Sequence, residues 1–118
     1  MGLLEELETL GVNVGEGLQR LNGNRAFYER MLGKFTDNIQ KYYVDTDFDN
    51  SDYTEITEKA HTIKGTAGNL SITPVYEAYT EIVNELRAGR PDAAKERIEK
   101  VLPVQNAIIA CIEKYKQA

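Results

Sequence analysis

The chain has 118 residues, of which 42% are apolar and 28% charged, and its net charge is -5. This length suits one domain with its own hydrophobic core, and a mean hydropathy of -0.46 is typical of a folded protein rather than of a disordered segment. The surplus of acidic residues lies in residues 1–60 and no basic face is evident, which argues against a nucleic-acid partner.

Apolar residues recur every three or four positions along most of the chain, which predicts an all-α domain. The stretch Leu3 to Leu10 predicts one short N-terminal helix. The following segment, GVNVGEGLQRLNGN, holds glycines and asparagines that we expect to break it into turns. Residues from about 1 to 22 are therefore predicted to cap a bundle that the rest of the chain forms, within a single domain over 1–118.

A longer helix is predicted from about Asn24 to Tyr43. At about 100° per residue, its apolar side chains share one face. Those side chains are Tyr28, Met31, Leu32, Phe35, Ile39 and Tyr42. We interpret this aromatic stripe as core, because apolar residues at helical spacing normally face the interior.

The acidic segment VDTDFDNSD, residues 44–52, partly matches a calcium-binding loop. The sixth and twelfth positions of such a loop, however, are here Asn50 and Ile56 instead of glycine and glutamate. We therefore favour a loop that precedes a helix, with Asn50 or Ser51 as the N-cap, and expect no metal site.

Three further helices complete the predicted up-down four-helix bundle. The first spans about Ser51 to Leu70, the second begins at Thr73 and ends near Gly89, and the third begins around Pro91. We expect Pro103 to kink the last helix, because proline lacks the amide hydrogen and crowds the preceding turn. The predicted core positions of the last two helices are Val75, Ala78, Tyr79, Ile82, Leu86, Ala94, Ile98, Val101, Gln105, Ile108, Ile112 and Tyr115.

The helix over about 51–70 carries two separate stripes. Ala60, Ile63, Ala67 and Leu70 fall within roughly 40° of Ile56 on a helical wheel and predict a buried seam. The only histidine, His61, lies about 140° away and should face solvent. The other members of this outward stripe are Thr57, Lys64, Gly65 and Gly68.

A glycine inside a helix costs about 1 kcal/mol relative to alanine, so two on one stripe need a reason. Without a Cβ atom, Gly65 and Gly68 let another surface approach the helix backbone beside His61. Lys64, one turn from His61, can bring a positive charge to an anion there, and we expect that anion to be a phosphoryl group. Each residue alone also has an explanation that involves no function. A surface histidine can be incidental, paired glycines can mark a frayed helix end, and a lysine is common on a solvated face.

The segment AHTIKGTAGNL resembles the phosphoacceptor motif of histidine-containing phosphotransfer (HPt) domains, and GVNVGEGLQRLNGNRAFYERML is similar to the lead-in of that family. The resemblance covers roughly residues 11–90. It implies a four-helix bundle in which His61 accepts a phosphoryl group from a receiver-domain aspartyl phosphate and passes it to another receiver's aspartate. It also implies that Lys64 stabilises charge on that group and that Gly65 gives the receiver clearance. Gly68 stands where the family usually has serine or alanine.

The resemblance further implies partners, and no cofactor held by the chain itself. The expected partners are response-regulator receiver domains and a hybrid histidine kinase, with Thr57, Gly65 and Gly68 in contact with the partner. The protein would have no kinase activity and no cofactor of its own, because Mg²⁺ would sit on the receiver. Two alternatives remain: a helical adaptor that binds such partners without phosphotransfer, and a hydrolase, which is disfavoured because the sequence places no Ser or Cys nucleophile with an orienting acid near His61.

Three features bear on where such a protein would work. The single cysteine, Cys111, cannot form an internal disulfide, which favours an intracellular location. No apolar run approaches the roughly 18 residues of a membrane span, and the acidic N-terminus is unlike a signal peptide. We therefore expect a cytoplasmic protein without membrane insertion, and a monomer because a bundle of this length can be stable alone.

Overall fold

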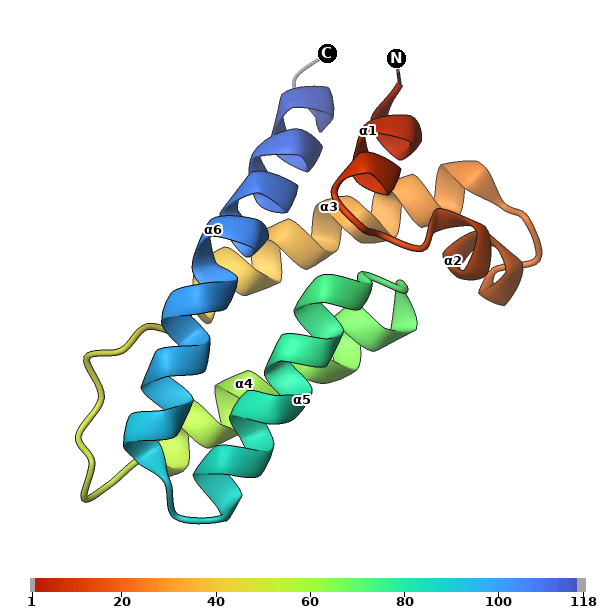
Figure 1. Cartoon of the computed structure of the whole chain (residues 1–118). Coiled ribbons are helices and arrows are strands. Elements are labelled where there is room, and N and C mark those ends of the chain that lie inside the picture. The colour runs from red at the N-terminus through yellow and green to blue at the C-terminus, as the bar shows by residue number, and fades with distance from the viewer. Residues whose placement is uncertain (1, 117–118) are drawn as a thin grey trace.

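The computed structural model describes residues 2–116, which contain six α-helices and no strand (Figure 1). The predicted all-α class is confirmed. Within the same residues, no helix combines the length and the apolar character that a membrane span requires. The helices are α1 (Leu3–Thr9), α2 (Val14–Arg20), α3 (Arg25–Lys41), α4 (Thr54–Asn69), α5 (Thr73–Arg87) and α6 (Pro91–Lys116).

Helix α5 lies between α4 and α6 and packs along both of them. Helix α3 packs more extensively on α6 than on α4, while α1 lies against α6 and α2. The molecule is elongated, with extents of 44 × 26 × 21 Å, and α1 lies beside the C-terminal end of α6 at one end of it (Figure 1). Helices α4 and α5 therefore lie side by side, and the start of α2 lies at the turn that connects them.

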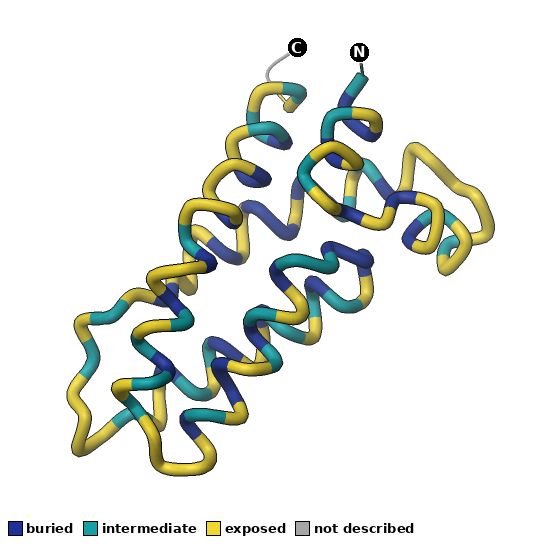
Figure 2. The backbone as a smooth tube through the Cα atoms, in the orientation of Figure 1, coloured by how far each residue is buried: buried dark blue, intermediate teal, exposed yellow. Residues whose placement is uncertain are grey.

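The buried residues form one apolar cluster along the inner faces of the helices (Figure 2). The predicted core positions of α3 are confirmed for Tyr28, Leu32, Phe35 and Ile39, each no more than 1% exposed. Tyr42 is an exception at 42% exposed, because α3 ends at Lys41 and the chain turns away. Of the predicted core positions in α5 and α6, those buried are Val75, Tyr79, Ile82, Leu86, Ala94, Ile98, Val101, Gln105, Ile108 and Ile112.

The predicted helix beginning around Pro91 is confirmed as α6, which extends to Lys116. Pro103 lies inside this helix without interrupting it. Gln105 of α6 belongs to a buried polar pair, in which the hydroxyl of Tyr79 on α5 donates to Gln105 Oε1 at 2.6 Å. This bond joins α5 to α6 inside the core, where an unpaired hydroxyl would be unfavourable.

The prediction that glycines and asparagines break residues 11–24 into turns was wrong for Val14–Arg20, which is helical. The Asn13 side chain caps this helix by accepting a hydrogen bond from the Glu16 amide at 3.2 Å. Gly17, which we had expected to break the segment, is buried against α3: a Cβ atom there would lie 2.7 Å from the Tyr28 ring. The glycine is therefore a packing requirement between α2 and α3.

Tyr28 also connects α3 to the end of α4. Its hydroxyl donates a hydrogen bond of 2.7 Å to the carbonyl oxygen of Leu70, the C-cap residue of α4. Burial raises the pKa of Tyr28 to about 12, so the hydroxyl keeps the proton that it donates. One side chain thus fixes the positions of three helices relative to one another.

The loop before α4 differs from its prediction at the N-cap. Helix α4 begins at Thr54, and its N-cap residue Tyr53 makes no side-chain capping bond. Asn50 instead donates to Asp92 Oδ1 at 2.8 Å, which ties the loop to the start of α6. Ser51 donates through its amide and hydroxyl to Asp49, so neither predicted N-cap residue reaches the helix.

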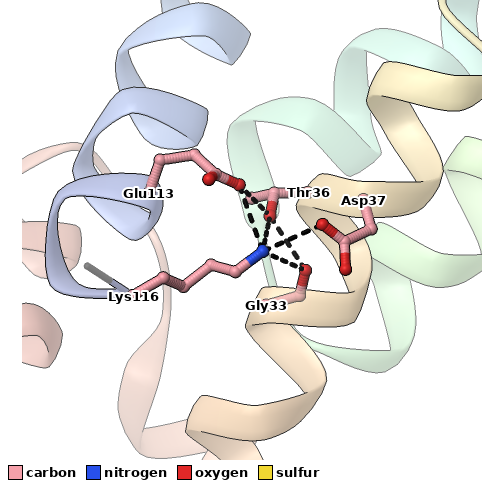
Figure 3. Close-up of polar contacts among 5 residues, drawn as sticks. All are labelled: Gly33, Thr36, Asp37, Glu113 and Lys116. Carbon is pink, nitrogen blue, oxygen red and sulfur yellow. Dashed lines mark hydrogen bonds and ion pairs between the residues drawn. The ribbon is translucent and has the colours of Figure 1, made fainter.

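A polar cluster joins the middle of α3 to the C-terminal end of α6 (Figure 3). Lys116 Nζ lies 2.9 Å from Asp37 Oδ1 and 3.3 Å from Glu113 Oε1. Thr36 Oγ1 lies 2.7 Å from Glu113 Oε1 and 2.8 Å from the Gly33 carbonyl, and its single hydrogen serves one of them at a time. The Asp37 carboxylate, followed by Glu113, holds the pKa of Lys116 above its usual range.

Replacing Tyr28 with phenylalanine tests the tie between α3 and α4. Tyr28→Phe leaves the buried Leu70 carbonyl without the hydroxyl, and we expect the free energy of unfolding to fall by about 1–2 kcal/mol. Urea unfolding followed by circular dichroism measures this change. Tyr42→Phe, at an exposed position directly after the same helix, is the control and should change stability little; equal effects of the two substitutions would contradict this role of Tyr28.

Candidate functional site

The buried seam of α4 is confirmed. Ala60 and Ala67 are fully buried, and Ile56, Ile63 and Leu70 are at most 8% exposed. These residues recur at intervals of three and four, so they share one side of the helix and face α5 and the core. Their burial fixes which side of α4 is left for solvent.

His61 lies on the exposed side of α4, as predicted. No hydrogen bond or ion pair joins its imidazole to another residue of the range 2–116. Lys64, one turn along, is partly buried and likewise has no ion-pair partner among the described residues. The site therefore offers an accessible imidazole and an uncommitted ammonium group one turn apart, where an incoming anion could meet both.

Gly65 follows His61 by one helical turn and is exposed. Outside its own helical turn, a Cβ atom at this position would meet no described atom within 4 Å, so no contact among residues 2–116 requires a glycine here. The bare backbone at Gly65 is consistent with clearance for a partner, which was the reason predicted from the sequence.

Gly68 differs from Gly65 although both lie on the same side of α4. It is only partly exposed, and a Cβ atom there would lie 2.9 Å from Cδ1 and Cε1 of Tyr76 on α5. Packing against the Tyr76 ring therefore accounts for this glycine inside the chain. Partner clearance is not needed to explain it.

Thr57 lies one turn before His61 and is partly buried. Its hydroxyl donates to the Tyr53 carbonyl at 2.7 Å, which occupies that hydrogen within the first turn of α4. The side chain borders a shallow hollow together with Leu86 and Arg87 of α5. Thr57 thus lies near the predicted site, but its hydroxyl hydrogen is already bonded to the backbone at the start of α4.

The sequence did not predict a second feature, a cleft next to Gly65 that three helices form. We call it the Tyr76 cleft; its lining includes Glu16, Arg20, Gly65, Asn69, Tyr76 and Glu77. Tyr76 is 39% exposed, so its ring is accessible at the cleft. The cleft forms only because α2 lies beside α4 and α5. The sequence predicts turns instead of α2, so it gives no sign of the cleft.

Hydrogen bonds around Ser71 hold α2 at this cleft. Ser71, in the turn between α4 and α5, has a positive φ of 56°, and its hydroxyl donates to Glu16 Oε1 at 2.7 Å. Its carbonyl accepts from the Asn13 amide at 2.9 Å. The Ser71 hydroxyl, together with the Arg20 guanidinium 3.3 Å away, lowers the pKa of Glu16. Glu16 therefore remains a carboxylate, which accepts the hydrogen bond from Ser71 and forms the ion pair with Arg20.

The structure contains no candidate metal site within residues 2–116, where no three or more His, Cys, Asp or Glu side chains come together in a suitable group. Asp49 of the acidic loop accepts hydrogen bonds from the amide and hydroxyl of Ser51 at 2.8 and 2.7 Å. These bonds lower the pKa of Asp49 and give its carboxylate a structural role in the turn.

Comparison with known proteins adds one positive finding. The family model described as "Hpt domain" matches residues 3–118, which is nearly the whole chain and includes α4 with His61. No curated protein matches the chain. No solved structure matches it either.

The two glycines of α4 should respond differently to alanine. Gly65→Ala introduces a methyl group into open space, so we expect it to stabilise the free protein by about 0.5–1 kcal/mol through better helix propensity. Gly68→Ala should gain less, because the new methyl group displaces the Tyr76 ring. Thermal and urea unfolding measure both changes; an equal gain at the two positions would contradict the packing described for Gly68.

Proposed function

The chain belongs to the Hpt domain family, and from this membership we propose that it is a phosphorelay intermediate with His61 as its phosphoacceptor. The family implies a histidine-containing phosphotransfer role in two-component signalling, and its members are phosphocarriers rather than kinases. We propose that His61 takes the phosphoryl group from a receiver-domain aspartyl phosphate and passes it to an aspartate of another receiver domain. A hybrid histidine kinase would stand upstream.

The observation that carries this proposal is the exposed, unbonded imidazole of the only histidine in the chain. Histidine side chains are largely neutral near pH 7, so one ring nitrogen offers a lone pair. That nitrogen attacks phosphorus, a P–N bond forms, and the bond from phosphorus to the aspartyl oxygen breaks, which releases the carboxylate. The reverse sequence of bonds returns the group to a receiver. An aspartyl phosphate is already reactive, so the site needs no buried base.

Lys64 supports the transfer electrostatically in this proposal. Its ammonium group has no ion-pair partner among the described residues and can reach the space above His61, one turn away. A positive charge there offsets the negative charge on the oxygens of the transferring phosphoryl group. In this proposal Mg²⁺ is bound by the acidic pocket of the receiver.

The remaining site residues shape the docking face. Gly65 lets the receiver backbone come close to α4, because no side chain stands between them. Thr57 borders the face on the N-terminal side of His61, and Gly68 contributes by seating the Tyr76 ring. A receiver that places its aspartate in line with His61 must cover all three positions.

We further propose that α3 to α6 are the helices of an up-down four-helix bundle and that residues 1–118 form one domain, with the first 22 or so as its cap. Support comes from the single apolar cluster that all the long helices share. The proposed setting is cytoplasmic, and the proposed state is a monomer that docks receivers one at a time.

The proposal predicts a labile phosphoryl label that depends on His61. Incubation with a ³²P-labelled receiver domain should give the wild-type chain an acid-labile, base-stable label, and His61→Gln should carry at least 100-fold less, as roughly expected when the nucleophile is lost. Circular dichroism should show both proteins equally folded, because His61 is exposed. Equal labelling of the two proteins would refute the proposal. Receiver binding without any label on the wild type would favour the adaptor alternative.

A bulky side chain at Gly65 should block docking without unfolding the domain. Gly65→Arg places its side chain in open space, so we expect a folded protein whose transfer rate falls by roughly tenfold or more. Ala107→Arg, at an exposed position of α6, is the matched control and should transfer normally. If Gly65→Arg unfolds the protein, Gly65 is structural; if it transfers like the control, the clearance role is wrong.

A further inference from the structure

The Tyr76 cleft lies within the area that any partner covering His61 must bury. Gly65, on its edge, follows His61 by four residues, or about 6 Å along the helix axis. A standard interface buries about 800 Å² on each partner, which corresponds to a patch roughly 30 Å across. A receiver domain centred on His61 therefore extends over the cleft.

The charges that line the cleft are unbalanced. Arg20 lies 3.3 Å from Glu16, and Glu16 also accepts the hydrogen bond from Ser71, so these two charges are already paired. Glu77 is exposed and has no hydrogen-bond or ion-pair partner among the described residues. The cleft therefore presents one unpaired carboxylate, which disfavours an incoming phosphate or carboxylate group.

An aromatic ring stands beside this carboxylate. Tyr76 precedes Glu77 on α5, is 39% exposed, and packs its ring against Gly68, where a Cβ atom would collide with it. A cation can rest on the face of such a ring while it pairs with a neighbouring carboxylate. An apolar side chain in the cleft would make contact only with the ring of Tyr76. It would also leave the Glu77 carboxylate partly desolvated and unpaired, which is unfavourable.

We infer that the Tyr76 cleft receives a basic side chain, arginine or lysine, of the receiver domain that docks over His61. The inference rests on the proposed function for its partner. Tyr76 and Glu77 would then determine which receivers the protein serves, while His61 and Lys64 carry out the transfer. The phosphoryl group itself does not enter the cleft.

The test measures binding separately from transfer. Fluorescently labelled receiver domains from the source organism are titrated with the wild type, Glu77→Gln, Glu77→Lys and Glu99→Gln. Glu99 is an exposed acid on α6, so Glu99→Gln makes the same charge change away from the site. At low salt we expect Glu77→Gln to bind its receiver roughly three- to fivefold more weakly than Glu99→Gln, and Glu77→Lys more weakly still. The difference should shrink at high salt, because exposed charges are screened.

Transfer to His61 from the same receivers distinguishes failure of this inference from failure of the proposed function. If Glu77→Gln binds as tightly as Glu99→Gln at low salt, the inference is wrong, whether or not the wild type is labelled. If Glu77→Gln weakens binding and the wild type takes no label, the inference stands and the phosphotransfer proposal fails. If none of the receivers binds the wild type, both fail.

Discussion

Helix α4 has to bury the narrow apolar stripe from Ile56 to Leu70 while His61 and Gly65 on its other side stay exposed. The rest of the structure is arranged around that constraint. Full burial of a residue such as Ile63 or Leu70 contributes about 1.5–3 kcal/mol, whereas a glycine inside a helix costs about 0.5–1 kcal/mol. The buried stripe therefore outweighs both glycines of α4. This surplus lets the helix hold His61 on an exposed and unencumbered face.

The end of α4 is fixed by groups that lie far from it in the chain. Tyr28 bonds to the Leu70 carbonyl, and Ser71 bonds to Glu16 and Asn13, so α2 and α3 both meet the turn that follows α4. Because α2 is placed there, the face that carries His61 continues into a cleft with a charged rim. The same packing thus gives the site a rigid base and a neighbouring surface on which partners can differ.

The sequence predicts the two stripes of α4 because helical periodicity depends only on local geometry. It does not separate Gly65 from Gly68, since the difference arises from the Tyr76 ring on another helix. It also fails for α2, where the glycines suggested turns but Gly17 is required by the Tyr28 ring. The N-cap of α4 was misplaced for a similar reason, because Asn50 bonds to Asp92 on α6 instead. Contacts between distant segments, rather than local preferences, decide each of these cases.

We propose that the exposed imidazole of His61 carries a phosphoryl group through a P–N bond. The most direct measurement is a ³¹P NMR spectrum of the unmodified protein after incubation with a phosphorylated receiver domain. We expect one protein-bound resonance in the phosphohistidine region. Its phosphorus should be coupled to the His61 ring, and the resonance should disappear when a second, unphosphorylated receiver is added. A spectrum that shows only inorganic phosphate and the receiver's aspartyl phosphate would contradict this proposal.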